Sequence, residues 1–432
     1  MAEEPDFDVI VIGAGVAGTV AAYQLASKGH SVVLIERGEA PGSKNLSGGI
    51  LYTHSIKTVF PDFLETAPYE RKIDKNRIVF TNPGSWVGVD YQDARLAQLG
   101  SAVSVLRAKL DAWLAEQAEG AGAMVMPGVR VDSLIKEGEQ ITGVVAGEDE
   151  LRARVVIAAD GVNSFIARDA GLRTKPRHEQ QAVGVKAVIK LDPAVIEDRF
   201  NVDSEHGVAY ALVGDCSLGV GGGGFLYTNK DTLSVGLVLR LDDLEKKKLR
   251  TVDIFDHYLE YPLVDSLVKG GELVEYGCHL VNEGGEAMMG QLVFPGLVIV
   301  GDAAGLTLNT GLTVRGMDLA IGSAIAASSA VSAALEKGDT SAAGLSGYTA
   351  NLASSFVGQD MHTYNKAPAF LESAVGMYGD YGQLLADVLH GAFSLDGTPR
   401  QHMSKVARQA LKKSPVKLMQ LAKDGLKGLK AL

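Results

Sequence analysis

The chain has 432 residues, of which 46% are hydrophobic and 22% charged, enough apolar content for a large core in two or three domains. The net charge is −11. Residues 400–432 hold nine Lys or Arg and one acid, so this tail carries +8 and the rest of the chain −19. The acidic charge of the rest of the chain argues against nucleic acid as a partner. Only two cysteines are present, Cys216 and Cys278, which excludes a disulfide framework, a zinc site or an iron–sulfur cluster built by this chain alone and makes a buried, inert thiol the default for both.

The N-terminal segment predicts a βαβ unit. An acidic start without presequence character leads directly into the apolar run 7–12, so we expect a cytoplasmic protein. This run is typical of a strand buried on both faces of a parallel sheet, residues 16–28 have helical character, and residues 31–36 form a second buried strand.

The turn between the first strand and the helix reads Gly13-Ala14-Gly15-Val16-Ala17-Gly18, the Gly-x-Gly-x-x-Gly pattern of a dinucleotide site. Gly13 permits the tight turn, Gly15 lets the backbone approach a pyrophosphate, and Gly18 lets helix and strand pack closely. Glu36 ends the second strand, where it accepts hydrogen bonds from an adenosine ribose and disfavours NADP, and Arg37 stacks on the adenine or reaches outward. The alternative is a plain turn with a solvent-facing Glu36.

The middle of the chain changes character twice. Residues 103–119 indicate an amphipathic helix, 129–150 alternate like a small meander, and 154–159 form another buried strand. From about 178 to 280, alternating segments between Gly- and Asn-rich turns predict a largely antiparallel sheet. The glycine run 221–224 falls in this region without a strand–helix context, so we expect no second dinucleotide domain.

The C-terminal third returns to the first pattern and then becomes helical. Residues 297–302 form a buried strand and 313–336 a long helix, whose uncharged part, 319–335, is too short and too rich in Ala, Ser and Gly for a membrane span. Residues 403–432 place Leu, Val and Met at helical spacing among lysines, with a break at Pro415. This tail suits an anionic membrane surface, an acidic partner subunit or packing on its own domain, and the pattern does not separate the three.

Two later segments decide between FAD and NAD. The segment around Asp160-Gly161 and the strand ending in Gly301-Asp302, followed by Thr310-Gly311-Leu312-Thr313, resemble flavoproteins of the class that includes aromatic hydroxylases, geranylgeranyl reductases and electron-transfer-flavoprotein:quinone oxidoreductases. The resemblance implies that Asp302 binds the ribityl hydroxyls and that a helix starting near Gly311 points its N-terminus at the flavin. It also implies that Arg107 reaches the FAD phosphates, against the alternative of a surface helix residue.

Over nearly the whole chain the sequence is most similar to the FixC family, the cluster-free relatives of electron-transfer-flavoprotein:quinone oxidoreductase. The segments that carry this resemblance are 44–49 (Lys-Asn-Leu-Ser-Gly-Gly), 221–229 and 275–285. It implies electron transfer from an electron-transfer flavoprotein, with its alpha and beta subunits, to a membrane quinone. It also implies a separate ferredoxin-like subunit, FixX, that supplies an iron–sulfur cluster. In some members of the family these proteins form a bifurcating FixABCX complex. The implied location is cytoplasmic, with peripheral contact to the inner face of the cell membrane.

The expected fold is α/β, a Rossmann-type FAD-binding domain of the glutathione-reductase and aromatic-hydroxylase class with an inserted, mostly antiparallel sheet domain and a helical C-terminal region. The expected boundaries are 1–177 and 286–336 for the FAD-binding domain, 178–285 for the substrate or quinone domain, and 337–432 for the helical region with its basic tail. The sequence assigns no catalytic side chain and no metal ligand. His279 is taken as a structural histidine, and the loop Ser47-Gly48-Gly49 is expected near the central ring of the flavin.

The candidate FAD-binding residues are Gly13, Ala14, Gly15, Val16, Ala17, Gly18, Glu36, Arg37, Lys44, Ser47, Gly48, Gly49, Arg107, Val131, Asp160, Gly161, Gly301, Asp302, Gly311, Leu312 and Thr313. Three other functions remain open. A stand-alone geranylgeranyl-reductase-like enzyme is weakened because that family's Tyr-x-Trp-x-Phe-Pro signature has no counterpart around Trp86 or Trp113. An aromatic monooxygenase would oxidise NAD(P)H and take up oxygen by itself, and a non-catalytic flavin scaffold would pass no electrons to quinone.

Overall fold

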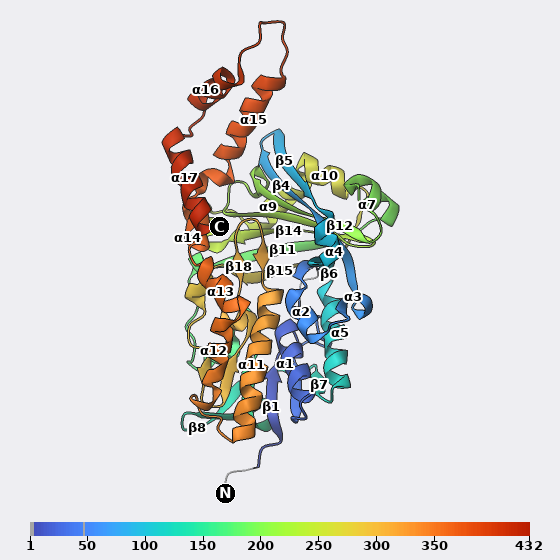
Figure 1. The fold of residues 1–432 in the computed structure, drawn as a ribbon, viewed down its shortest axis with the longest axis vertical. Coiled ribbons are helices and arrows are strands. Elements are labelled where there is room, and N and C mark those ends of the chain that lie inside the picture. Colours follow the sequence, from blue (N-terminus) through green and yellow to red (C-terminus); the bar gives the residue numbers. More distant parts are fainter. Residues whose placement is uncertain (1–3, 46–47) are drawn as a thin grey trace.

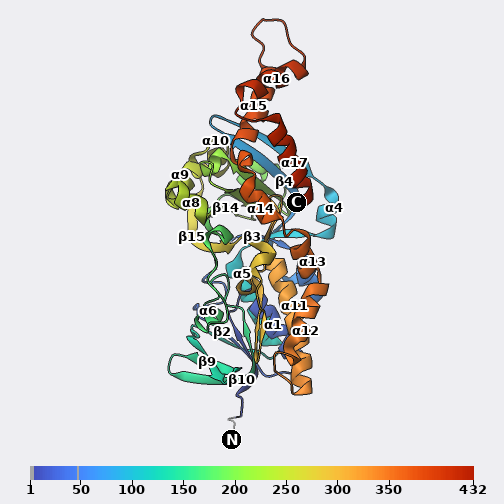
Figure 2. The same cartoon turned by 90° about the vertical axis from the view of Figure 1, so that its left-hand side faces the viewer.

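Two β-sheets follow one another along the long axis of the molecule, and helices extend beyond the second sheet (Figure 1). The computed structural model describes residues 4–45 and 48–432. Figure 2 shows the same order from the side, with the N-terminus at one end and the C-terminal helices toward the other. The chain passes between the two sheets more than once, so residues that are distant in sequence meet at their junction.

The first sheet has the order β16-β17-β10-β1-β2-β7, in which β17 to β7 are parallel neighbours and β16 pairs antiparallel with β17. Its central residues, such as Val9 to Val11, have no exposed surface, which confirms the predicted buried strands. Its strands are β1 (Phe7–Ile12), β2 (Val32–Glu36), β7 (Met124–Pro127), β8 (Ser133–Glu137), β9 (Gln140–Ala146), β10 (Asp149–Ala158), β16 (Val293–Phe294) and β17 (Leu297–Ile299). The strands β8, β9 and the start of β10 form the predicted meander.

The helices α1 (Val16–Ala26), α5 (Arg107–Gly120) and α11 (Met317–Lys337) pack side by side along the first sheet (Figure 1). Small residues let α1 and α11 approach closely, and both helices are buried along most of their length. Among the described residues, α11 is the one helix long and apolar enough to cross a membrane, yet 83% of its apolar window is buried inside the protein. This burial matches the predicted role of a packed core helix.

The prediction of a helix over 313–336 was wrong at its N-terminal end. Residues 314–315 form β19 (Val314–Arg315), which pairs with β18 (Leu308–Asn309), so the chain makes a short hairpin before the helix begins at Met317. The helix expected over 103–119 likewise begins later, at Arg107, because β6 (Ala102–Val105) joins the second sheet. In both places pairing with another part of the chain overrides the local helical pattern.

The second sheet has the order β15-β11-β14-β13-β12-β4-β6-β3, with β5 paired to β4. Its strands are β3 (Gly49–Tyr52), β4 (Tyr69–Asn82), β5 (Ser85–Gln92), β6 (Ala102–Val105), β11 (Gln181–Lys190), β12 (His206–Gly214), β13 (Gly222–Thr228), β14 (Thr232–Arg240) and β15 (Glu272–Asn282). The sheet is mostly antiparallel, as predicted, but β12 and β4 pair in parallel.

The strands β3 to β6 correct the predicted boundaries. They lie within the range 1–177 that was assigned to the FAD-binding domain, yet they belong to the second sheet, because β4 pairs with β12 over residues 72–81 and β6 with β3 and β4. The chain therefore leaves the first sheet after β2, builds one half of the second sheet, and returns through α5.

Helices cover the second sheet on the face away from the junction and form its own core with residues such as Val235, Leu237, Ile254 and Tyr258. These helices are α7 (Pro193–Phe200), α8 (Leu241–Lys247), α9 (Thr251–Glu260) and α10 (Pro262–Val268). Shorter helices connect the strands: α2 (His54–Val59), α3 (Phe63–Thr66), α4 (Ala94–Leu99), α6 (Phe165–Asp169) and the single 3-10 turns His178–Gln180, Asp215–Ser217, Gly285–Met288, Gly301–Ala304, Gly344–Ser346 and Val375–Tyr378.

The C-terminal region is helical, as predicted. It contains α12 (Gly347–Ser354), α13 (Phe356–Thr363), α14 (Ala367–Ser373), α15 (Asp380–Phe393), α16 (Met403–Lys413) and α17 (Leu418–Ala431). Pro415 lies in the predicted break between α16 and α17. The helices α15 and α16 extend past the second sheet, whereas α17 returns to pack against α14 (Figures 1 and 2).

Candidate cofactor site

A cavity of about 1520 Å³ lies between the two sheets and is lined by residues from both. Ligand pockets for small molecules commonly range over about 300–1,000 Å³, so this cavity has room for a ligand of dinucleotide size. It runs from the turn after β1, past the N-terminal end of α5, toward the β18–β19 hairpin and α14. The strand ends that line it are the carboxyl ends of parallel strands, where open α/β sheets bind ligands.

The turn after β1 has the geometry that its glycines predict. Gly13 has φ of +102°, and a Cβ on it would lie 2.5 Å from the carbonyl oxygen of Ala159. A Cβ on Gly18 would lie 1.9 Å from the carbonyl oxygen of Gly13, so this position accepts no side chain. Gly15 faces the cavity directly before α1 begins at Val16, which leaves the free N–H groups of the first helical turn available to an anion.

Glu36 is held against this turn rather than facing solvent. Its carboxylate accepts hydrogen bonds from the backbone N–H of Ala14 at 2.9 Å and of Gly38 at 2.7 Å. Glu36 lines the cavity together with Arg37 and Val131. Glu36 therefore does not extend freely into solvent, and each of its carboxylate oxygens can accept a further hydrogen bond.

Arg107, at the start of α5, points into the cavity and not to the surface. Its guanidinium binds both carboxylate oxygens of Asp111 at 2.8 Å, and Asp111 is fully buried and also accepts from Asn45 at 2.5 Å. Burial lowers the pKa of Arg107, but the Asp111 carboxylate outweighs it, so the guanidinium is held charged with a pKa above its usual value. No other described residue accepts from its remaining N–H groups, and a phosphate could do so.

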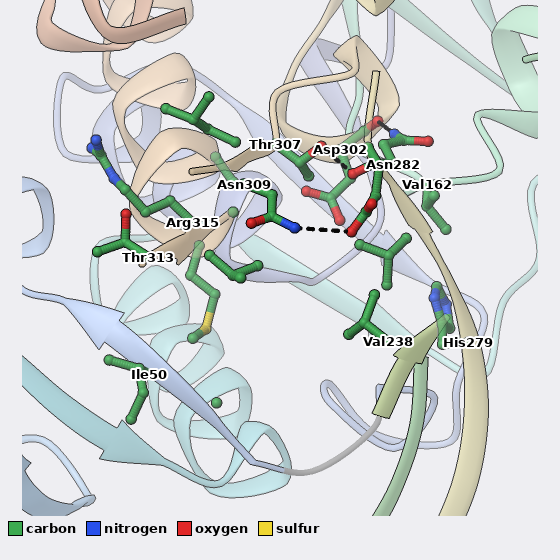
Figure 3. Close-up of a pocket in the computed structure, with 18 of the residues that line it drawn as sticks. Ile50, Val162, Val238, His279, Asn282, Asp302, Thr307, Asn309, Thr313 and Arg315 are labelled. Carbon is green, nitrogen blue, oxygen red and sulfur yellow. Dashed lines mark hydrogen bonds between the residues drawn. The ribbon is translucent and has the colours of Figure 1, made fainter. Parts of the chain in front are cut away.

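Asp302 follows β17 in the 3-10 turn Gly301–Ala304, at the opposite end of the cavity from Glu36. Burial raises the pKa of its carboxyl, although Arg107 and His279 oppose the shift. Asn282 donates to the Asp302 carbonyl at 3.0 Å, and Thr307 donates to the Asn282 carbonyl at 2.7 Å. Figure 3 shows Asp302, Asn282 and Thr307 gathered on one side of the cavity.

Two buried polar atoms at this cavity have no partner among the described residues. They are Oδ1 of Asn282 and Oδ1 of Asp160, and an unpaired buried acceptor is costly. A ligand that carries hydroxyl or N–H donors along its length satisfies them. The glycine turn, the charged Arg107 and these two acceptors therefore fit a ligand with a diphosphate joined to a polyol, as in FAD.

Residues 308–315 form a hairpin over the cavity, and this alters one predicted contact. Gly311 has φ of +78° and donates its N–H to Oδ1 of Asn309 at 2.8 Å, while Thr310 and Thr313 bond to each other across the turn. Because α11 begins at Met317, Gly311 and Thr313 do not form its first turn. A Cβ on Gly316 would lie 4.0 Å from Oδ1 of Asp302, so the N-terminus of α11 is directed at the Asp302 end of the cavity.

The cavity brings together most of the residues that the sequence predicts. Those that line it are Gly13, Gly15, Val16, Ala17, Glu36, Arg37, Lys44, Gly48, Gly49, Arg107, Val131, Asp160, Gly161, Asp302, Gly311, Leu312 and Thr313. Ala14, Gly18 and Gly301 do not line it but shape the two turns that do, and Ser47 lies outside the described residues. The binding roles of all these residues remain predictions.

Sequence reasoning missed several residues of the second sheet. Lys186 lines the cavity from β11, and Glu283 lines it next to Asn282. Asn309 donates to Oε1 of Glu283 at 3.3 Å, and burial raises the pKa of the Glu283 carboxyl (Figure 3). A lysine in the middle of the apolar strand 181–191 was the available signal for Lys186. Cys278 is exposed, so the expectation of a buried thiol there was wrong, whereas Cys216 is buried.

Comparison with known protein families places the cavity in a FAD-binding fold. Residues 6–207 match the FAD binding domain family, and residues 367–432 match the ETF-QO/FixC family C-terminal domain. Among solved structures, the chain is similar to a geranylgeranyl bacteriochlorophyll reductase-like protein from Thermoplasma acidophilum, with a TM-score of 0.67 and 21% identity over 97% of this chain and 98% of the other. It also resembles the flavin-dependent brominase Bmp2, with a TM-score of 0.62 and 16% identity over 94% and 98% of the two chains. At these identities the likeness shows the fold alone.

The sequence relatives are much closer. The chain is 46% identical to the probable electron transfer flavoprotein-quinone oxidoreductase YdiS of Escherichia coli K12, over 99% of each chain. It is 42% identical to the protein FixC of Escherichia coli O157:H7, over 99% of this chain and 100% of that protein, and 38% identical to the probable electron transfer flavoprotein-quinone oxidoreductase YgcN of Escherichia coli K12, again over 99% and 100%. The chain therefore belongs to the FixC and electron-transfer-flavoprotein:quinone oxidoreductase family of FAD-dependent oxidoreductases.

Proposed function

We propose that this protein passes electrons from an electron-transfer flavoprotein to a membrane quinone through FAD held in the cavity, as the FixC-like subunit of a FixABCX-type complex. The observation that carries the proposal is the cavity itself. It is built jointly by both sheets, it contains a diphosphate-fitting turn at one end, and its other end is lined by exposed apolar residues of the β18–β19 hairpin, such as Leu312 and Val314. FAD takes up two electrons together and releases them singly, which suits transfer between a flavoprotein and a quinone.

In this proposal the chain's residues hold FAD at both ends. The N-terminus of α1 and Arg107 bind the diphosphate, Glu36 binds the adenosine ribose, and Asp302 binds the ribityl hydroxyls. The fully buried Asp111 keeps Arg107 extended toward Gly15, so the guanidinium is in position before FAD arrives.

The proposed electron route includes a separate ferredoxin-like subunit, FixX. An iron–sulfur cluster needs several thiolates, and this chain has only Cys216 and Cys278. Cys216 is buried and burial raises the pKa of its thiol to about 11, so it is not available as a thiolate ligand. A cluster on the route is therefore assigned to another chain, which docks on this one.

The C-terminal helices supply the proposed contact with the membrane. In α15, α16, α17 and their connections, Phe393, Leu395, Met419 and Leu429 are each at least 72% exposed. Residues 400–432, which include α16 and α17, carry a net charge of +8 on an otherwise acidic chain. Apolar side chains among lysines at the surface are typical of helices that lie on anionic membranes.

Purification of the native protein from its own cells tests the proposal. We expect a yellow complex that contains both electron-transfer flavoprotein subunits and the spectroscopic signal of an iron–sulfur cluster. A yellow protein that purifies alone, oxidises NADPH and consumes oxygen would identify a monooxygenase instead. A lone protein that reduces isoprenoid double bonds would favour the geranylgeranyl-reductase-like alternative, and one that binds FAD but exchanges electrons with neither donor nor quinone would be a scaffold.

A further inference from the structure

Lys186 occupies an unusual position in the second sheet. It lies at the centre of β11, and its two neighbours across the sheet are both glycines, Gly236 on β14 and Gly277 on β15. Neither neighbour has a side chain to cover the lysine. Its side chain faces the cavity between the two sheets, on the side where the loop before β3 passes.

The ammonium group of Lys186 is fixed by contacts from two directions. Nζ donates to the carbonyl oxygen of Gly48 at 3.0 Å and lies 5.5 Å from the centre of the Phe225 ring. The Phe225 ring fills the space over Gly236, where a Cβ would lie 2.4 Å from Cζ of the ring. Gly48 itself packs so closely that a Cβ on it would lie 2.1 Å from Oγ of Ser234. Lys186 therefore ties the second sheet to the loop 48–49.

Two charged groups act on Lys186, whose side chain is partly exposed: Arg107 on α5 and Glu275 on β15. Burial lowers the pKa of Lys186 to about 8; Arg107 lowers it further and Glu275 raises it. Because Lys186 is partly removed from water, an additional anion beside it would stabilise its charged form.

We propose that Lys186 is a redox-tuning residue, whose positive charge stabilises the negative charge that FAD gains in this cavity on reduction and so raises its midpoint potential. The proposal rests on FAD lying with its ring system beside the loop 48–49. Two electrons from the reductant and one proton from solvent convert oxidised FAD to a reduced form with one added negative charge on the ring. In that cavity Lys186 contacts Gly48 of the loop directly, whereas Arg107 is engaged by Asp111 near Gly15.

The proposal has a pH signature whose sign follows from linkage. The negative charge of reduced FAD raises the pKa of Lys186 above its value in the oxidised protein. Between these two pKa values, reduction places a second proton on Nζ in addition to the one on the flavin. The midpoint potential is therefore expected to fall more steeply with pH once the pH exceeds about 8. The slope returns to its smaller value at a pH high enough to deprotonate Lys186 in the reduced protein as well.

Spectroelectrochemical titration of the FAD-loaded full-length protein, on both sides of pH 8, tests this. Lys186→Met should bind as much FAD per chain as the unaltered protein but have a lower midpoint potential. Its potential should also lack the steeper pH dependence above about pH 8. Lys186→Arg should keep the higher potential. Lys190→Met, at the exposed end of the same strand, is the matched control and should change neither.

Sulfite provides a second readout that does not depend on activity, because it adds to oxidised flavins to give an anionic adduct. The affinity for sulfite should fall about tenfold in Lys186→Met, the change expected for a loss equivalent to one pKa unit. An unchanged potential, pH slope and sulfite affinity in Lys186→Met would overturn the proposal. Loss of FAD from both Lys186→Met and Lys186→Arg would also overturn it, since the lysine would then serve binding or folding rather than the potential.

Discussion

The Nη2 atom of Arg107 lies 3.5 Å from the point that a Cβ on Gly15 would occupy, although 92 positions of the chain separate the two residues. The absence of a side chain at Gly15 and the fixed guanidinium of Arg107 therefore define one space. An anion in that space meets the free N–H groups of α1 from one side and Arg107 from the other.

Arg107→Met is expected to weaken FAD binding about 10- to 100-fold, because hydrogen bonds to charged groups contribute roughly 1.5–3 kcal/mol. Titration of the FAD-free protein with FAD, followed by flavin fluorescence, measures the change. The matched control is Arg250→Met, which removes an arginine that pairs with Asp253 at the surface. Equal FAD affinity in the two variants would show that Arg107 does not reach the diphosphate.

Gly18→Ala is expected to destabilise the protein by at least about 2 kcal/mol and to abolish FAD binding, since its Cβ would overlap the carbonyl oxygen of Gly13 at 1.9 Å. Urea unfolding, followed by circular dichroism, measures the change. At Gly425 in α17 a Cβ meets nothing within 4 Å, so Gly425→Ala should instead be neutral or stabilising by up to about 1 kcal/mol. A Gly18→Ala protein as stable as Gly425→Ala would contradict the tight turn.

Asp302→Asn is expected to stabilise the FAD-free protein at neutral pH and to abolish or greatly weaken FAD binding. Burial raises the pKa of Asp302 above that in the unfolded chain, so its contribution to stability is present at low pH and is lost as the pH rises through the folded-state pKa. The amide of Asp302→Asn does not ionise, so the variant does not lose stability in this way as the pH rises. Thermal melts across pH should therefore show the variant more stable than the FAD-free parent at neutral pH, with the difference vanishing in acid.

With FAD present the order should reverse, because a ligand that binds only the folded state stabilises it. The parent then gains stability that Asp302→Asn does not. If Asp302→Asn, or the shorter Asp302→Ala, retains full FAD occupancy, the assignment of this carboxylate to the ribityl chain is wrong.

The basic tail predicts salt-dependent binding to anionic vesicles. Replacing Lys412, Lys413 and Lys417 by Gln should weaken binding by about 1 kcal/mol for each charge lost near the surface. Co-sedimentation with phosphatidylserine vesicles at several salt concentrations measures this, and neutral vesicles should bind weakly at all of them. A triple Gln variant at Lys28, Lys136 and Lys269, which are exposed outside the tail, is the control. Equal binding of both triple variants would favour packing or a protein partner as the role of the tail.

The part of the site that was predictable from sequence is the part made by short segments. The turn 13–18 and Glu36 belong to one βαβ unit, so their spacing determines that they meet. Asp302 was assigned through the resemblance of residues 301–313 to other flavoproteins, and its place at the end of a buried strand agrees with that role. The pairing of Arg107 with Asp111, one helical turn later, follows from helical spacing. The direction of the Arg107 side chain into the cavity does not, because it depends on how α5 packs on α1.

The features that were missed depend on distant pairing. Residues 314–315 have no local signal against a helix, and only their pairing with 308–309 delays α11 to Met317. The parallel pairing of β4 with β12 joins segments more than a hundred residues apart, so a boundary drawn along the chain could not show that residues 69–82 belong to the second sheet. Lys186 reads as an ordinary polar position of a strand until its two glycine neighbours and Gly48 are placed around it.

Anaerobic mixing of the FAD-loaded protein with reduced electron-transfer flavoprotein, followed by addition of a quinone, tests the central claim most directly. The account predicts that the FAD absorbance of this protein is bleached by the flavoprotein, with FixX present, and recovers when quinone is added, while NADPH alone produces no bleaching. Bleaching by NADPH and recovery only with oxygen would contradict the account.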